Sequence, residues 1–154
     1  MGSLHRRPVS ARSRKAQRKG SILDGVPENL PPLSRAYQLT RKASKFGFDW
    51  SDIGGILSKL DEELKELKEA LLAQDRNRVR EEVGDLLFVL ANIARFLHIN
   101  PERALGKTVQ KFISRFRYIE RTLRKEGRTL SQSNLVEMDR LWEEAKKKRT
   151  RLKG

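Results

Sequence analysis

Apolar residues recur every three or four positions from Leu33 onward, and no segment alternates between apolar and polar residues as a half-buried strand does. Breaks in this pattern fall at Gly47, at Asn100-Pro101 and at Gly127, because glycine and proline disfavour the interior of a helix. The pattern predicts five helices, at residues 33–46, 52–74, 76–98, 101–126 and 133–150. We therefore expect an all-α protein, a helical bundle whose long second, third and fourth helices are antiparallel in pairs.

The second and third predicted helices each carry an apolar stripe along one face. In the second helix the stripe consists of Ile56, Leu57, Leu60, Leu64, Leu67 and Leu71. In the third helix it consists of Val79, Val83, Leu86, Leu90, Ile93 and Leu97. Leu87, Phe88 and Ala91 cover other directions of the third helix, so this helix should lie at the centre of the bundle. Asp52 is suited to cap the start of the second helix.

Carboxylates interrupt these apolar faces. Because successive helical residues are about 100° apart, Glu82 falls inside the apolar sector of the third helix, and Asp85 continues the same flank. Glu63 and Glu66 lie beside the stripe of the second helix, again three residues apart. If the two helices pack antiparallel across the short connection near residues 74–76, the two pairs of carboxylates face each other. Buried carboxylates at this spacing need a compensating positive charge.

Two kinds of cation could compensate these carboxylates. A Lys or Arg partner would give a buried network of ion pairs, and a divalent ion would give a metal centre. Four converging carboxylates repel one another strongly without a dication between them, which favours the metal. Oxygen ligands with no Cys in the chain and no His nearby select a hard ion, Mg²⁺ first and Mn²⁺ as a substitute.

The positive charge of the chain is concentrated at its two ends. The formal net charge is +14, yet 13 of the 34 Lys and Arg residues lie in residues 1–20 and 146–154, where there is no Asp or Glu. The middle therefore carries 21 bases against 20 acids. We divide the chain into a disordered basic tail (1–20), a helical domain (21–148) and a second basic tail (149–154). Contact with nucleic acid is expected to be weak and confined to the tails.

Composition also bears on the compartment. Cysteine is absent, which excludes disulfides and thiolate metal sites. Neither an apolar signal segment nor a run long enough to span a membrane is present, so we expect a cytoplasmic protein without a membrane partner.

The acidic motifs resemble those of the MazG-type nucleoside triphosphate pyrophosphohydrolases. The segment "EELKE" (62–66) followed by "EVGD" (82–85) resembles the two-part signature of this family. Flanking blocks extend the resemblance from about residue 21 to 148: "SILDGVPENLP", "KFGFDW", "KFISRF" and the late Trp142. The first of these blocks is most similar to the start of the C-terminal domain of two-domain members.

The resemblance implies an all-α fold, a homodimer or higher homo-oligomer, and Mg²⁺-dependent hydrolysis of nucleoside triphosphates to monophosphate and pyrophosphate. Carried over by motif position, the metal ligands would be Glu63, Glu66, Glu82 and Asp85. Glu62 would be an outer catalytic carboxylate that holds a second metal or orients water. In "KFISRF", Lys111 and Arg115 would bind phosphate and assist catalysis, and Trp142 would border the base. We also predict that Lys59 and Asn92, on the flanks of the acidic helices, bind substrate.

The fourth helix can be interpreted independently. Its apolar stripe consists of Leu105, Phe112, Phe116, Ile119 and Leu123. Lys111 and Arg115 lie together on one flank, which suits a substrate with phosphates, although a solvated flank has the same pattern. Trp142, taken alone, fits a core position as well as a stacking surface. One departure from the family is visible, because Val109 stands where the family usually has Asn.

Other functions remain compatible with the sequence. A narrower pyrophosphohydrolase, acting on dUTP, dCTP or phosphoribosyl-ATP, would have the same acidic motifs. A non-catalytic helical oligomer that binds nucleic acid through the tails would have the same apolar stripes.

Overall fold

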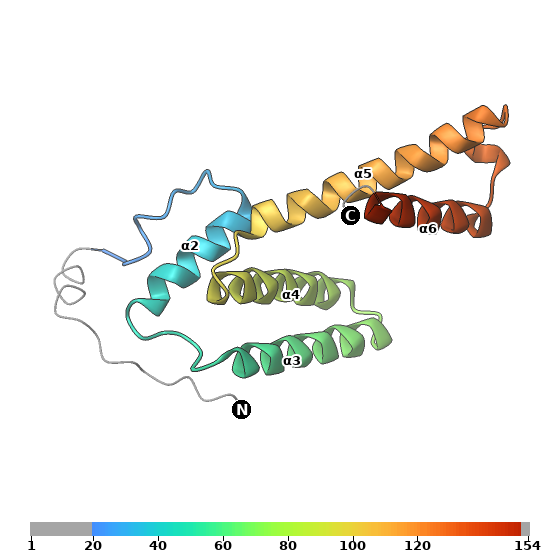
Figure 1. Ribbon diagram of the computed structural model, residues 1–154. Coiled ribbons are helices and arrows are strands. Elements are labelled where there is room, and N and C mark those ends of the chain that lie inside the picture. Colours follow the sequence, from blue (N-terminus) through green and yellow to red (C-terminus); the bar gives the residue numbers. More distant parts are fainter. Residues whose placement is uncertain (1–19, 152–154) are drawn as a thin grey trace. The chain divides into compact units, whose positions relative to one another are not determined.

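A computed structural model describes residues 20–151 of the chain, and these residues form helices and no strand. The helices are α2 (Pro32–Ser44), α3 (Ile53–Leu72), α4 (Arg76–Phe96), α5 (Pro101–Lys125), the short 3₁₀ helix η2 (Leu130–Gln132) and α6 (Leu135–Arg151). The predicted all-α fold is confirmed, and the five predicted helices correspond to α2 through α6 (Figure 1). Residues 1–19 and 152–154, which hold most of the predicted tails, lie outside the described residues.

The chain divides into two compact units between Glu102 and Arg103. The first unit contains α2, α3, α4 and the first residues of α5, and the second contains the rest of α5, η2 and α6. No helix among residues 20–151 combines the length and hydropathy needed to cross a membrane. The cytoplasmic location stays a prediction.

In the first unit α4 is the central helix, as predicted, because it packs against both α2 and α3. The helices α3 and α4 run antiparallel side by side (Figure 1). Asp52 caps α3 as predicted: its Oδ1 accepts a hydrogen bond from the Gly55 N–H at 2.9 Å. Asp75 caps α4 in the same way, accepting from the N–H groups of Asn77 and Arg78. The two caps fix where the acidic segments of α3 and α4 begin, and so their register.

The apolar stripes of α3 and α4 are only partly buried within residues 20–151. Ile56, Ala70, Val89 and Ala91 are buried. Two series at seven-residue spacing remain 41–56% exposed: Leu57, Leu64 and Leu71 on α3, and Val83, Leu90 and Leu97 on α4. Periodicity shows that a face is apolar but not what covers it, and three helices of this length cannot cover one another on every side.

The second unit has a small closed core between α5 and α6. Ile119 and Leu123 of α5 and Leu141 of α6 are each at most 2% exposed. Five partly buried residues pack against them: Phe116, Tyr118, Leu130, Met138 and Trp142. The turn between the helices includes Gly127 at φ +69°, a left-handed conformation that glycine adopts without steric cost.

Candidate metal centre

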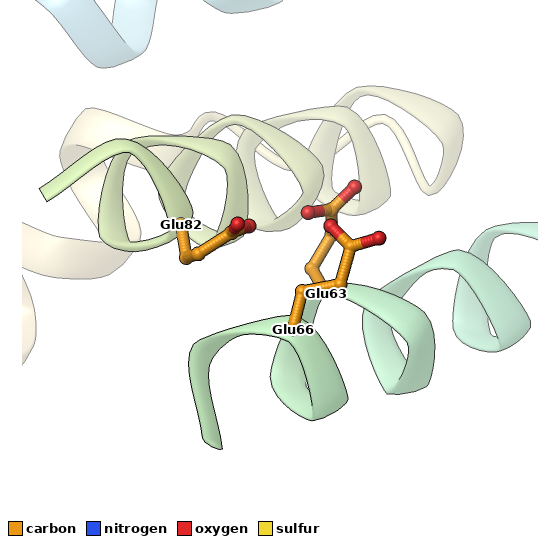
Figure 2. A group of neighbouring side chains, drawn as sticks. All are labelled: Glu63, Glu66 and Glu82. Atoms are coloured by element: carbon orange, nitrogen blue, oxygen red, sulfur yellow. The ribbon is translucent and has the colours of Figure 1, made fainter. Parts of the chain in front are cut away.

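Three of the predicted metal ligands lie together in the first unit. Glu63 and Glu66 on α3 and Glu82 on α4 each offer a carboxylate oxygen, and these oxygens all lie within 4.8 Å of one another. Figure 2 shows the three carboxylates, hereafter the carboxylate cluster, turned toward one another across the two helices. The arrangement follows from the sequence, because residues three apart share a face of α3 and the short turn before Asp75 brings α4 back alongside it.

Two members of the carboxylate cluster are buried, and each lacks a hydrogen-bond partner for one of its oxygens. Glu63 is only 5% exposed and Glu82 only 7% exposed. One oxygen of each, Oε2, is buried without a hydrogen-bond partner. Burial raises the pKa of Glu82, the negative charge of Glu66 raises it further, and the nearby Arg78 acts in the opposite direction. A buried carboxylate oxygen without a partner is costly, and a cation is one ligand that would offset this cost.

Two basic side chains balance part of this charge. The Lys59 ammonium lies 2.7 Å from Glu63 Oε1 and 2.9 Å from Glu62 Oε1. Hydrogen bonds to Glu63 first and Glu62 second raise the pKa of Lys59. At the other side of the cluster, Arg78 Nε lies 3.4 Å from Glu82 Oε1. The ion-pair network that the sequence left open is therefore present, but it satisfies only one oxygen of each buried carboxylate.

Two further predicted acidic residues lie outside the carboxylate cluster. Asp85 is one turn along α4 from Glu82, is exposed, and is not among the three residues whose oxygens converge. Its role as a fourth ligand stays a prediction. Glu62 is 56% exposed at its side chain and is held by Lys59, so its carboxylate borders the cluster from the solvent side. This position suits the predicted outer carboxylate.

The residues present fit a hard dication. The donor set consists of carboxylate oxygens alone, which is the ligand type that Mg²⁺ and Mn²⁺ prefer. The two buried, unpartnered oxygens are on different helices, so one cation between α3 and α4 would satisfy both. Glu63, Glu66 and Glu82 would hold it.

A cavity of about 370 Å³ adjoins the carboxylate cluster through Lys59. Its walls are mainly apolar and aromatic, with a few polar groups, which is the usual make-up of a small-molecule site. It is lined by Leu23, Leu39, Thr40, Ala43, Phe48, Asp49, Trp50, Ile56, Lys59, Phe88, Val89, Asn92 and Arg95. The predicted substrate-binding residues Lys59 and Asn92 thus both border this cavity.

An ion pair in the wall of the cavity, between Asp49 and Arg95, was not predicted from the sequence. Arg95 of α4 is only 7% exposed and binds both oxygens of Asp49, at 2.6 and 3.0 Å. Its Nε also donates to Asn92 Oδ1 at 2.8 Å. The pair fastens the loop that carries Phe48 and Trp50 to α4, and it orients Asn92. Arg95 among the mainly apolar residues 86–96 of α4 was the sequence signal that could have revealed it.

The remaining predicted substrate residues belong to the second unit. Lys111 and Arg115 are half-buried and one turn apart on α5. The Arg115 guanidinium lies 5.3 Å from the centre of the Trp142 ring, and Phe112 packs on the same ring at 5.4 Å. Arg115 and Trp142 are therefore neighbours within this unit. Trp142 also packs against the core of this unit, so its contact with a base stays a prediction.

The first unit is thus a helical unit in which three carboxylates converge between two antiparallel helices, and their oxygen atoms fit a hard metal ion. Residues 54–119, which include the whole carboxylate cluster, match the family model of the MazG nucleotide pyrophosphohydrolase domain. This match assigns residues 54–119, under half of the chain, to a MazG-type domain.

Curated relatives extend the similarity beyond this segment. The chain is 42% identical over 132 residues to the nucleoside triphosphate pyrophosphohydrolase/pyrophosphatase MazG of Thermotoga maritima, covering 86% of this chain and 51% of the relative. It is 36% identical over 140 residues to the nucleoside triphosphate pyrophosphohydrolase of Escherichia coli K12, covering 88% and 52%. It is 45% identical over 136 residues to the uncharacterized protein YabN of Bacillus subtilis, covering 88% and 28%. The chain spans about half the length of the first two relatives.

Proposed function

We propose that this chain hydrolyses nucleoside triphosphates to nucleoside monophosphate and pyrophosphate and that it depends on Mg²⁺. The carboxylate cluster carries the proposal, because two buried oxygens on facing helices lack a partner that a cation would provide. The activity printed in the names of the Thermotoga maritima and Escherichia coli relatives supports the reaction. Mn²⁺ is expected to substitute for Mg²⁺, since it accepts the same oxygen ligands.

The metal would be held by Glu63, Glu66 and Glu82, with Asp85 as a further ligand. When bound, Mg²⁺ supplies Lewis acidity and positive charge where the triphosphate and the attacking water meet. Glu62, which is exposed and paired with Lys59, is proposed to accept the proton of that water. The water oxygen bonds to the α-phosphorus, the bond from this phosphorus to the bridging oxygen breaks, and pyrophosphate leaves.

Two other parts of the chain would bind the substrate. The half-buried cations Lys111 and Arg115 are proposed to contact the phosphates and stabilise the leaving pyrophosphate. The cavity beside Lys59 is proposed to take the nucleoside portion, with Trp50 as an aromatic wall and Asn92 as a hydrogen-bonding group. Trp142 is retained as a proposed neighbour of the base.

We further propose that the chain forms a homodimer or higher homo-oligomer through α3 and α4. The residues at seven-residue spacing, Leu57, Leu64 and Leu71 with Val83, Leu90 and Leu97, make two adjoining apolar faces. Such faces are characteristic of helices that pack against a partner. A second copy of the same pair would bury them in a bundle of four helices.

The test of the reaction is a panel of ribo- and deoxyribonucleoside triphosphates incubated with Mg²⁺ and separated by chromatography. Formation of monophosphate and pyrophosphate supports the proposal, whereas accumulation of diphosphate and orthophosphate contradicts the site of cleavage. Turnover restricted to dUTP, dCTP or phosphoribosyl-ATP would establish the narrower alternative. Complete inertness with both Mg²⁺ and Mn²⁺ would favour the non-catalytic oligomer, for which deletion of residues 1–20 should abolish binding to nucleic acid.

A further inference from the structure

Lys59 contacts both the carboxylate cluster and the adjoining cavity. Its ammonium is 2.7 Å from Glu63 Oε1 and 2.9 Å from Glu62 Oε1, and its side chain also lines the cavity. Its side chain is 33% exposed, so packing does not enclose it on every side.

Arg78, the other base at the cluster, is placed differently. Its contacts are longer, 3.4 Å to Glu82 Oε1 and 3.5 Å to Glu69 Oε2, and its second partner lies outside the cluster. Arg78 does not border the cavity beside Lys59. Movement of Arg78 would therefore not bring a positive charge to that cavity, whereas movement of Lys59 would.

A dication and the Lys59 ammonium compete for the same carboxylate. Mg²⁺ takes oxygen ligands at about 2.0–2.1 Å, and a bound Lys59 ammonium would hold a like charge close to it. The short contact between Lys59 and Glu63 is therefore favourable without a dication and unfavourable with one.

We propose that Lys59 is the counter-cation of the metal-free centre and that metal binding displaces its ammonium toward the cavity, where it meets the bound nucleotide. This inference rests on the proposed metal centre but not on turnover. One lysine then couples the two ligands: the metal frees a positive charge for the nucleotide, and the nucleotide stabilises the lysine in its displaced position. The coupling is reciprocal, so each ligand strengthens the binding of the other.

The test compares Mn²⁺ binding by the wild-type chain, Lys59→Met and Lys65→Met, measured by calorimetry without nucleotide. Methionine keeps an unbranched apolar side chain but removes the competing charge. Lys65 is the control, because it lies on the same helix with its side chain 78% exposed and 4.0 Å from Glu69. We expect Lys59→Met to bind Mn²⁺ about tenfold more tightly than wild type, and Lys65→Met to match wild type. Equal or weaker binding by Lys59→Met overturns the proposal.

A second arm measures the coupling, with a nonhydrolysable α,β-methylene triphosphate added to each protein. The analogue should tighten Mn²⁺ binding more in wild type than in Lys59→Met. Equal tightening in both proteins would overturn the displacement toward the cavity. If wild type binds no Mn²⁺ under either condition, the metal centre itself is wrong, which separates that failure from a failure of this inference.

A third measurement separates competition from loss of folding. In EDTA, Lys59→Met should unfold at a lower temperature than wild type, because Glu62 and Glu63 lose their counter-charge. Mn²⁺ should then raise the unfolding temperature of Lys59→Met by more than it raises that of wild type. Lys59→Arg, which retains the charge, should restore wild-type Mn²⁺ affinity. A metal-induced increase no larger than that of wild type, or tight binding by Lys59→Arg, would contradict the proposal.

Discussion

The carboxylate cluster of the first unit and Glu137 of the second unit differ in how fully their oxygens are hydrogen-bonded. In the second unit the half-buried Glu137 is fully engaged: Arg128 binds both of its oxygens at 2.6 and 2.7 Å, and the Ser133 hydroxyl donates to it at 2.6 Å. In the first unit Glu63 and Glu82 are more deeply buried, and each has an oxygen without a partner. A buried carboxylate oxygen without a partner opposes folding. An additional ligand at the carboxylate cluster would compensate this cost.

Both units bury some apolar residues and leave others exposed. The core residues Ile119, Leu123 and Leu141 of the second unit are almost completely buried by their own unit. On α3 and α4 the six residues at seven-residue spacing remain 41–56% exposed, and α5 leaves Leu105 and Phe112 exposed by 49% and 56%. The second unit thus has a closed core cluster, whereas the first unit carries the regular series of exposed apolar residues.

The largest expected effect concerns the carboxylate cluster. Glu82→Gln should lower turnover by about 1000-fold or more, since even the supporting partners of metal ligands cost roughly 10–100-fold when removed. Steady-state kinetics with Mg²⁺ measures this, and Glu81→Gln is the control because Glu81 is the exposed neighbour of Glu82. In EDTA the Glu82→Gln protein should be at least as stable as wild type. Retained turnover would remove Glu82 from the mechanism.

The next effect concerns the core of the second unit. Leu141→Ala should lower the free energy of unfolding by about 3 kcal/mol, because it leaves a cavity among Ile119 and Leu123. Val136→Ala on the same helix, where the side chain is 82% exposed, should change it by less than about 0.5 kcal/mol. Chemical denaturation followed by circular dichroism measures both. Similar losses in the two variants would mean that this core is not closed.

A smaller effect is expected at the exposed stripes. Leu64→Glu places a charge in the proposed contact between copies and should raise the dissociation constant of the oligomer about 30-fold, or about 2 kcal/mol. Leu72→Glu is the control, because Leu72 is 86% exposed and lies outside the seven-residue series. Analytical ultracentrifugation reports the mass of each protein. A wild-type monomer, or an oligomer unaffected by Leu64→Glu, would exclude this face.

The smallest effect is a pH dependence in the second unit. The hydrogen bonds from Arg128 and Ser133 lower the pKa of Glu137 to about 2, from its ordinary value of 4.5. A lowered folded-state pKa stabilises the protein above pH 4.5, and this contribution is lost as the pH falls from 4.5 toward 2. Glu137→Gln should therefore be less stable at neutral pH and should lose less stability across that interval.

Acid titrations followed by circular dichroism compare wild type, Glu137→Gln and Asp139→Asn, whose side chain is exposed on the same helix. Asp139→Asn should follow wild type. If Glu137→Gln also follows wild type between pH 4.5 and 2, the ion pair with Arg128 contributes nothing to stability.

Much of the fold was predictable because local signals determine it. The 3.6-residue period and the breaks near Gly47, Pro101 and Gly127 gave every helix to within about two residues at most ends, and Asp52 capped α3 as expected. The burial of Glu82 was predictable for the same reason, since its position inside an apolar sector depends only on helical geometry.

Other features depend on tertiary contacts that periodicity does not contain. The ion pair between Asp49 and Arg95 joins residues 46 positions apart, so the local sequence around one residue does not indicate that the other is its partner. The exposure of Leu64 and Leu90 depends on what else packs nearby, which the stripe alone leaves open. Asp85 shares a flank with Glu82, yet its exposed side chain lies outside the converging group.

The most direct test of the metal centre is a crystal structure of the chain soaked with Mn²⁺, with the ion located by its anomalous scattering. We expect a peak between α3 and α4, within bonding distance of Glu63, Glu66 and Glu82, that is absent from crystals of Glu82→Gln. A Mn²⁺ peak elsewhere, or no peak in crystals that also hold a nucleotide analogue, would contradict a dication held by these carboxylates.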